Sequence, residues 1–282
     1  MKAIARGKER AQRAVAEARH RWPVVDHGLR THERYAEAYG ARLAAAIAYF
    51  GFFAIFAFGV VLYSVLGFLV EYHVDLREQV DQFLQENLPV IDSDQIAAGR
   101  GAAGVIALIG LVVTGLGWVE TLRSSQRRIW HLEQAPGSAI VRRLVDLVAL
   151  VGLALLLGLS FAVVTGIEAV VAAWAQPVAW IIRPIGWVLL AGVNLVLAVA
   201  LLSVLPRIRA PLRRLLPPAV AVAVALVILN TLGQAYVRGV QENPAYSVVA
   251  TAAGLLVYLY LVHQIVLYAA AWAATDRPPP AS

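Results

Sequence analysis

Three charged residues near the ends of long apolar runs are the first candidates for chemistry: Glu168, Arg183 and Arg238. Each lies 24 or 25 residues from a basic residue at the other end of a long apolar run: Arg143, Arg207 or Arg214. At about 1.5 Å per residue in a helix, this spacing places the three charges at a similar depth, about 36 Å from those arginines. Two interpretations stay open. Glu168 pairs with one arginine in a polar vestibule while the other meets an anionic lipid headgroup, or the three charges reach the membrane interface separately.

A second group of polar residues lies deeper in the apolar runs. Asn230 and Gln234 share a helical face with Arg238, at spacings of four residues. The others are Asn194, His263 and Gln264. Because unpaired polar groups are costly in hydrocarbon, we expect these side chains to face the bundle interior or a wet cavity. They would form either a polar path for a substrate or interhelical hydrogen bonds without transport.

The histidines do not suggest a metal or nuclease site. Metal-dependent hydrolysis needs His and Asp side chains clustered around one or two ions. The six histidines are scattered along the chain: His20, His27, His32, His73, His131 and His263. The chain also lacks cysteine and a Walker-type GxxxxGK[ST] motif. We therefore expect no enzymatic activity, no metal and no cofactor, and ATP-driven pumping is excluded.

Long apolar runs must position these residues. After Arg42 the chain continues for 28 residues without a charge, up to Val70, whereas roughly 20 apolar residues cross a bilayer. Five further apolar runs follow. The sequence therefore predicts an all-α integral membrane protein, with a six-helix transmembrane domain over residues 42–274. The predicted spans are about 43–70, 101–119, 144–174, 180–204, 217–238 and 246–274.

The positive charges between these runs indicate an orientation. The successive numbers of Lys plus Arg are ten in 1–42, two in 71–100, five in 120–143, one in 175–186, four in 205–214, one in 237–245 and one after 274. This alternation follows the positive-inside rule with both termini cytoplasmic. Membrane topology thus accounts for the basic loops, and we expect no nucleic-acid partner.

The segments outside the spans have patterns of their own. Residues 1–41 are basic and predict amphipathic helices that lie in the cytoplasmic interface against anionic lipid, with a solvated basic arm as the alternative. The apolar face of the second of these patterns carries Trp22, Val25, Leu29, Ala36, Tyr39 and Leu43. Residues 71–100 predict a short amphipathic helix on the outer surface, and residues 275–282 form a short polar tail.

Two rows of small residues predict close helix packing. Gly51, Gly59 and Gly67 are spaced eight apart on one face of the first span. The third span carries Ala154, Gly158, Ala162 and Gly166 at spacings of four. Such faces let helix backbones approach closely, so we expect the two rows to pack together. They would also allow a homo-oligomer.

Three short segments resemble the YihY/BrkB family of bacterial inner-membrane proteins. They are Leu43–Phe50 at the start of the first span, Arg127–Trp130 in a basic loop, and Leu256–Leu261 followed by Gln264 in the last span. Two segments depart from the family pattern. Ala54 and Phe56-Ala57 stand where the family has Ser and Phe-Pro, and Ala269–Ala271 stands where it has Gly-Ala-Glu.

The resemblance implies a six-helix inner-membrane protein linked with serum resistance or with lipid and envelope transport. The family once carried the label of a tRNA-processing ribonuclease, which the scattered histidines oppose. We therefore expect a transporter or flippase-like component for lipids or other amphiphilic envelope molecules, with membrane lipids as partners. The alternative is a non-transporting membrane scaffold or partner-binding protein.

Overall fold

The computed structural model describes residues 19, 21–72, 102–173, 179–240 and 247–276. Every regular element in this part of the chain is a helix, as the sequence predicted. The elements are α2 (Pro23–Glu37), α3 (Gly40–Tyr72), α6 (Ala102–Ile129), α7 (Ala139–Ala173), α8 (Ala179–Val199), the π-helix η2 (Ala200–Val204), α9 (Leu212–Val240) and α10 (Ser247–Thr275).

Four described stretches are long and apolar enough to cross a membrane: Gly40–Phe58, Val105–Ile129, Leu212–Leu229 and Val249–Thr275. A shorter apolar helix covers Ala191–Val204. The count of six spans and the cytoplasmic termini stay predictions. The helix predicted on the outer surface, most of the C-terminal tail and residues 1–18 lie outside the described residues.

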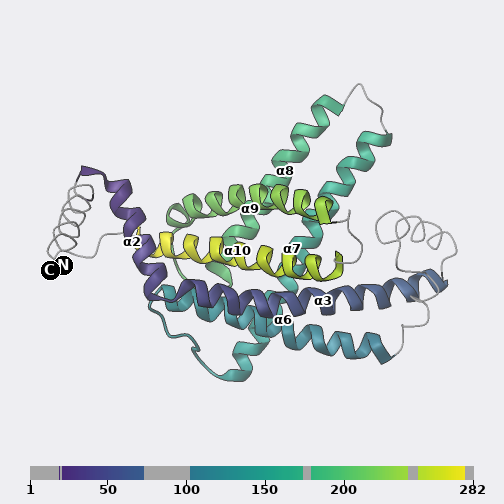
Figure 1. Cartoon of the computed structure of the whole chain (residues 1–282), viewed down its shortest axis with the longest axis horizontal. Coiled ribbons are helices and arrows are strands. Elements are labelled where there is room, and N and C mark those ends of the chain that lie inside the picture. Colours follow the sequence, from purple (N-terminus) through teal and green to yellow (C-terminus); the bar gives the residue numbers. More distant parts are fainter. Residues whose placement is uncertain (1–18, 20, 73–101, 174–178, 241–246, 277–282) are drawn as a thin grey trace.

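The helices form two groups that diverge from one end of the molecule (Figure 1). α10 packs between α3 and α9, and α3 lies along α6. α7 and α8 pair with each other and extend at a steep angle to the other four long helices (Figure 1). This arrangement brings the start of α3, the end of α6, the start of α9 and the end of α10 together beside α2.

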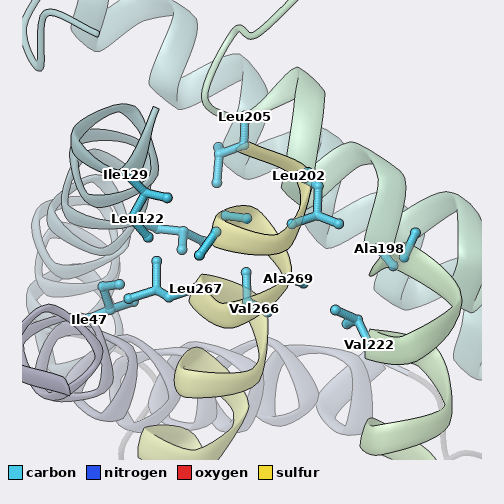
Figure 2. Close-up of a cluster of buried hydrophobic side chains, with 14 of the residues drawn as sticks. Ile47, Leu122, Ile129, Ala198, Leu202, Leu205, Val222, Val266, Leu267 and Ala269 are labelled. Carbon is cyan, nitrogen blue, oxygen red and sulfur yellow. The ribbon is translucent and has the colours of Figure 1, made fainter. Parts of the chain in front are cut away.

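The buried apolar side chains gather at this shared end. Figure 2 shows α10 in the middle, with Val266 and Leu267 facing Ile47 of α3, Leu122 of α6 and Leu202 of η2. By contrast, the first half of α6 leaves large side chains exposed: Val105, Ile106, Leu108, Ile109 and Val113. Apolar side chains without protein contacts suit a lipid environment, so the protein packs tightly at one end and offers apolar surface towards the other.

α2 packs against the end of α10 through the face opposite to the one that the sequence marked as apolar. Tyr35 is only 6% exposed, and its ring stacks on Tyr268 of α10 with 3.8 Å between centroids. Trp22 and Val25, from the predicted apolar face, remain 60% and 42% exposed. α2 is therefore held by protein on one side and presents apolar surface on the other.

A tight turn joins α2 to α3. Tyr39 adopts a left-handed backbone conformation, with φ of 59°. The next residue must be glycine, because a Cβ at Gly40 would lie 2.2 Å from the ring of Tyr35. The buried Tyr35 ring therefore leaves no room for a side chain at position 40.

The seam expected between the two rows of small residues is not formed where the structure describes it. A Cβ at Gly51 would lie 3.2 Å from Trp118 of α6, so Gly51 faces α6 rather than α7. α3 packs mainly on α6 and α10, while α7 packs on α8 and α6, and Ala154 is exposed. The structure does not describe the packing of the other members of the two rows, which are Gly59, Gly67, Gly158, Ala162 and Gly166. The spacing of small residues predicts a face suited to close packing, but it does not predict which helix packs there. For this reason the expected pairing of Gly51 with the third span was wrong.

Candidate functional site

The last turns of α6 bury several polar side chains. Arg123, Ser125, Gln126 and Arg127 are 1%, 2%, 0% and 9% exposed. The segment Glu120–Ile129 contains no glycine or proline that would end the helix, so α6 continues ten residues beyond the predicted span end at 119. Because polar groups buried this deeply are stable only with partners, the contacts of these residues define the candidate site.

Asp146, near the start of α7, is the centre of the cluster. Arg123 donates two hydrogen bonds to its carboxylate, from Nε to Oδ1 at 3.0 Å and from Nη2 to Oδ2 at 3.1 Å. Arg207, beyond η2, donates from Nη2 to Oδ1 at 2.9 Å. The side chains of Arg123 and Asp146 are 1% and 4% exposed. This buried ion pair therefore joins α6, α7 and the η2–α9 connection at one point.

The other cluster residues bind backbone carbonyls. Arg127 donates to Glu133 O and, at 3.0 Å, to Pro206 O. Gln126 donates to Leu201 O of η2 at 2.9 Å. A π-helix is wider than an α-helix, and π-helices frequently occur at functional sites. These bonds hold the α6–α7 connection at Glu133 and the η2–α9 connection at Pro206 against the cluster.

The cluster carries an excess of positive charge. It combines Arg123, Arg127 and Arg207 with one buried carboxylate, Asp146. Glu120 lies 4.0 Å from Arg123, but its side chain is 50% exposed, so solvent screens its charge. Oε1 of Gln126, which is fully buried, has no hydrogen-bond partner among the described residues. The cluster can therefore hold helices together and attract an anion.

Within the described ranges, no group of three or more His, Cys, Asp and Glu side chains could hold a metal ion. His263 of α10 accepts a hydrogen bond from Trp118 Nε1 at Nε2, over 2.9 Å. Its Nδ1 donates to Leu259 O at 2.6 Å. Both ring nitrogens are therefore used, and this histidine makes an interhelical hydrogen bond between α6 and α10.

A second polar cluster lies where α2 docks. His27 donates from Nε2 to Trp272 O at 3.1 Å, and the hydroxyls of Thr31 and Thr275 meet at 3.1 Å. Arg34 donates from Nε to Ile129 O, the end of α6, at 2.6 Å. Burial lowers the pKa of Arg34, and the hydrogen bond and charge of Glu37 oppose this only in part. α2 thus closes the C-terminal ends of both α6 and α10.

The structure describes the side chains of only some of the candidate residues from the sequence. Glu168, Arg183 and Arg238 lie on α7, α8 and α9, but their side chains are outside the description. The same holds for Asn230 and Gln234 on α9. Asn194 on α8 and Gln264 on α10 are partly buried. The vestibule and the polar path therefore stay predictions, while His263 is placed in a helix contact.

The apolar pattern does not predict the Arg123–Asp146–Arg207 cluster, because residues 120–143 have the composition of a loop between two spans. One signal was present. Asp146 is the only acidic residue between Glu133 and Glu168, and it stands at the edge of an apolar run. An ionisable residue there needs a partner, and Arg123 and Arg127 lie one turn apart on the preceding segment.

Comparison with known proteins identifies the family. The model of the family "Virulence factor BrkB" matches residues 31–277. The chain belongs to the BrkB family. This BrkB-family protein is 26% identical to Inner membrane protein YhjD of Escherichia coli (strain K12), over 93% of this chain and 84% of that protein. It is also 23% identical to an uncharacterized protein of Dickeya dadantii (strain 3937), over 91% of this chain and 84% of that protein. No solved structure matches it.

The family and the helices agree on the location of the protein. Its relative is an inner membrane protein, and its described helices include four that could cross a membrane. The BrkB-family protein is therefore a multi-pass protein of the inner membrane, as the resemblance implied.

Proposed function

We propose that this BrkB-family protein is a transporter or flippase-like component that acts on anionic amphiphiles of the bacterial envelope, such as lipids. The observation that carries the proposal is the buried excess of positive charge at the end of the bundle. Arg123 and Arg207 there bind one buried carboxylate, and Arg127 nearby binds only backbone carbonyls. Buried cations attract anionic headgroups far more strongly than exposed ones do. Six spans, cytoplasmic termini and binding of anionic lipid by the basic N-terminal helices belong to this proposal.

The divergence of the helices supports movement as well as binding. Asp146 of α7 is tied to α6 through Arg123 and to the η2–α9 connection through Arg207. Further along α7, Val148, Val151 and Leu155 are exposed on one face, while Leu153 is buried on the other. An ion pair at one end of such a helix can serve as a hinge point. Neither catalysis nor nucleic-acid binding is part of this proposal.

Lipid redistribution in proteoliposomes tests the proposal. The protein is reconstituted with fluorescent anionic or zwitterionic lipids, and exchange between leaflets is followed by quenching. We expect the anionic lipid to redistribute faster than in empty vesicles. Arg207→Gln, which loses the bond to Asp146, should slow it about tenfold, while Arg209→Gln, at an exposed position nearby, should not. Rates equal to those of empty vesicles for several lipid classes would reject transport.

A non-transporting scaffold is the second candidate. It is favoured by the carbonyl contacts of Arg123 and Arg127, since each arginine also fixes a loop. It predicts that deletion of residues 1–21 abolishes the envelope phenotype while Glu168→Ala and Arg238→Ala are silent. The reverse pattern in a complementation assay would remove it.

A further inference from the structure

A pocket lies where α2, the end of α6, the start of α9 and the end of α10 meet. Its volume is about 380 Å³, and Arg30, Arg34, Trp130, His131, Arg214 and Thr275 are among its lining residues. None of its described lining residues is acidic. The volume falls within the range of small-molecule sites. The pocket is separate from the Arg123–Asp146–Arg207 cluster, with which it shares no lining residue.

Hydrogen bonds to helix ends hold two of the arginines in place. Arg214 donates to Ala273 O and, at 2.8 Å, to Ala274 O, and its guanidinium lies 5.0 Å from the ring centre of Trp130. Arg34 donates to Ile129 O and to His131 Nε2. Both guanidiniums are therefore oriented before any ligand arrives, which lowers the entropy lost on binding.

The pocket has more donors than acceptors. Arg34 Nη2, Arg214 Nη1 and both Nη atoms of Arg30 make no hydrogen bond within the described part of the chain. The buried Nε1 of Trp130 has no partner there either. A wall of this kind suits a ligand that offers several acceptor oxygens around one negative charge.

The neighbouring negative charges do not fully neutralise the arginines of the pocket. Asp26 pairs with Arg30 at 3.1 Å, and Glu37 pairs with Arg34 at 3.3 Å, but the side chain of Glu37 is 66% exposed. Arg214 meets no carboxylate in the described residues, only the carbonyl end of α10. A helix end contributes roughly half a unit of negative charge. The guanidinium charges are therefore only partly balanced by groups that solvent screens.

We propose that this pocket binds the phosphate group of a phosphate ester, held by Arg30, Arg34 and Arg214. The pocket adjoins the ends of two apolar helices, α6 and α10, so the headgroup of an anionic phospholipid and a soluble phosphate can both reach it. The site deepens the proposed function by naming the ligand group, and it rests on that function only for its link to lipid movement.

Native mass spectrometry of the full chain in an uncharged detergent tests the site. The probes are inorganic phosphate, short-chain phosphatidylglycerol and, as a zwitterionic comparison, short-chain phosphatidylcholine. We expect phosphatidylglycerol or phosphate to bind more tightly than phosphatidylcholine. Arg214→Gln and Arg30→Gln should each weaken this binding at least about tenfold. Arg213→Gln is the matched control, because Arg213 is exposed on the same helix and does not line the pocket.

The two probes distinguish the source of the ligand. Binding of phosphatidylglycerol alone identifies a lipid headgroup, and binding of inorganic phosphate identifies a site for the phosphate group itself. Because Arg214 also closes α10, Arg30→Gln and the melting temperature of each variant separate lost binding from lost folding. Equal binding by wild type, Arg30→Gln and Arg214→Gln overturns the proposal, as does no binding of either anion. Phosphate binding without lipid redistribution would reject only the transport function.

Discussion

Arg123 on α6 and Asp146 on α7 meet through two parallel N–H···O bonds while both side chains are almost completely buried. Removal of one partner from such a pair leaves an uncompensated charge in a site from which water is excluded. We therefore expect Asp146→Ala to destabilise the protein by about 3–5 kcal/mol. Denaturant titration in detergent micelles measures the change.

Glu120→Ala is the matched control for this loss. Glu120 also approaches Arg123, at 4.0 Å, but its side chain is 50% exposed. Screened pairs of this kind contribute about 0–1 kcal/mol. Similar losses for the two variants would show that the contact with Asp146 is not the stronger one.

The phenol of Tyr35 predicts a loss of stability at alkaline pH. Burial, with smaller effects of Tyr268 and Tyr260, raises the pKa of Tyr35 to about 12, compared with about 10 in the unfolded chain. The folded state holds this proton more tightly, so the contribution is complete below pH 10 and is lost between pH 10 and 12. The expected slope is about 1.4 kcal/mol per pH unit.

Tyr35→Phe should remove that slope, and Tyr39→Phe, at an exposed ring, should keep it. The free energy of unfolding measured between pH 9 and 11.5 provides the comparison. A slope that is unchanged in Tyr35→Phe would mean that another group titrates there.

Gly51 and Gly110 form a matched pair of glycines in apolar helices. A Cβ at Gly51 would lie 3.2 Å and 3.3 Å from two atoms of the Trp118 indole, whereas nothing lies within 4 Å of a Cβ at Gly110. We expect Gly51→Leu to destabilise the protein by about 1–3 kcal/mol through overpacking. Gly110→Leu should change stability by less than about 1 kcal/mol, and thermal unfolding followed by tryptophan fluorescence compares them.

The hydrogen bond between Trp118 and His263 predicts coupled mutations. Trp118→Phe leaves Nε2 of the buried histidine without a donor, which costs about 1–3 kcal/mol. His263→Leu removes the same bond from the other side. In a double-mutant cycle, the two losses should therefore not add, with a coupling of at least about 0.5 kcal/mol. Additive losses would exclude an energetic contact between these residues.

The sequence predicted the helical class and the approximate places of the long helices, because uncharged runs of such length have few alternatives. It did not predict where α6 ends. Arg123 and Arg127 looked like loop charges, and only the packing of α7 shows that Asp146 neutralises one of them. Contacts between segments far apart in sequence leave no local pattern.

The amphipathic pattern of α2 also did not predict which of its faces packs against α10. Trp22 and Val25 mark the apolar side of the helix, yet Tyr35 and Thr31 make the contact with α10. An amphipathic pattern identifies the side that avoids water, and in a membrane protein lipid can serve that side as well as protein can. The side with tyrosine and threonine is left for specific contacts.

The docking of α2 has a consequence for the order in which the protein is made. His27 and Trp272 are bonded across 245 positions, so the ribosome releases α2 long before its docking surface exists. Until α10 has been inserted, Tyr35 lacks the ring on which it stacks. α2 can therefore dock only after the last helix is complete. A chain that stops before Trp272 would leave its N-terminal helix unattached and accessible to proteases.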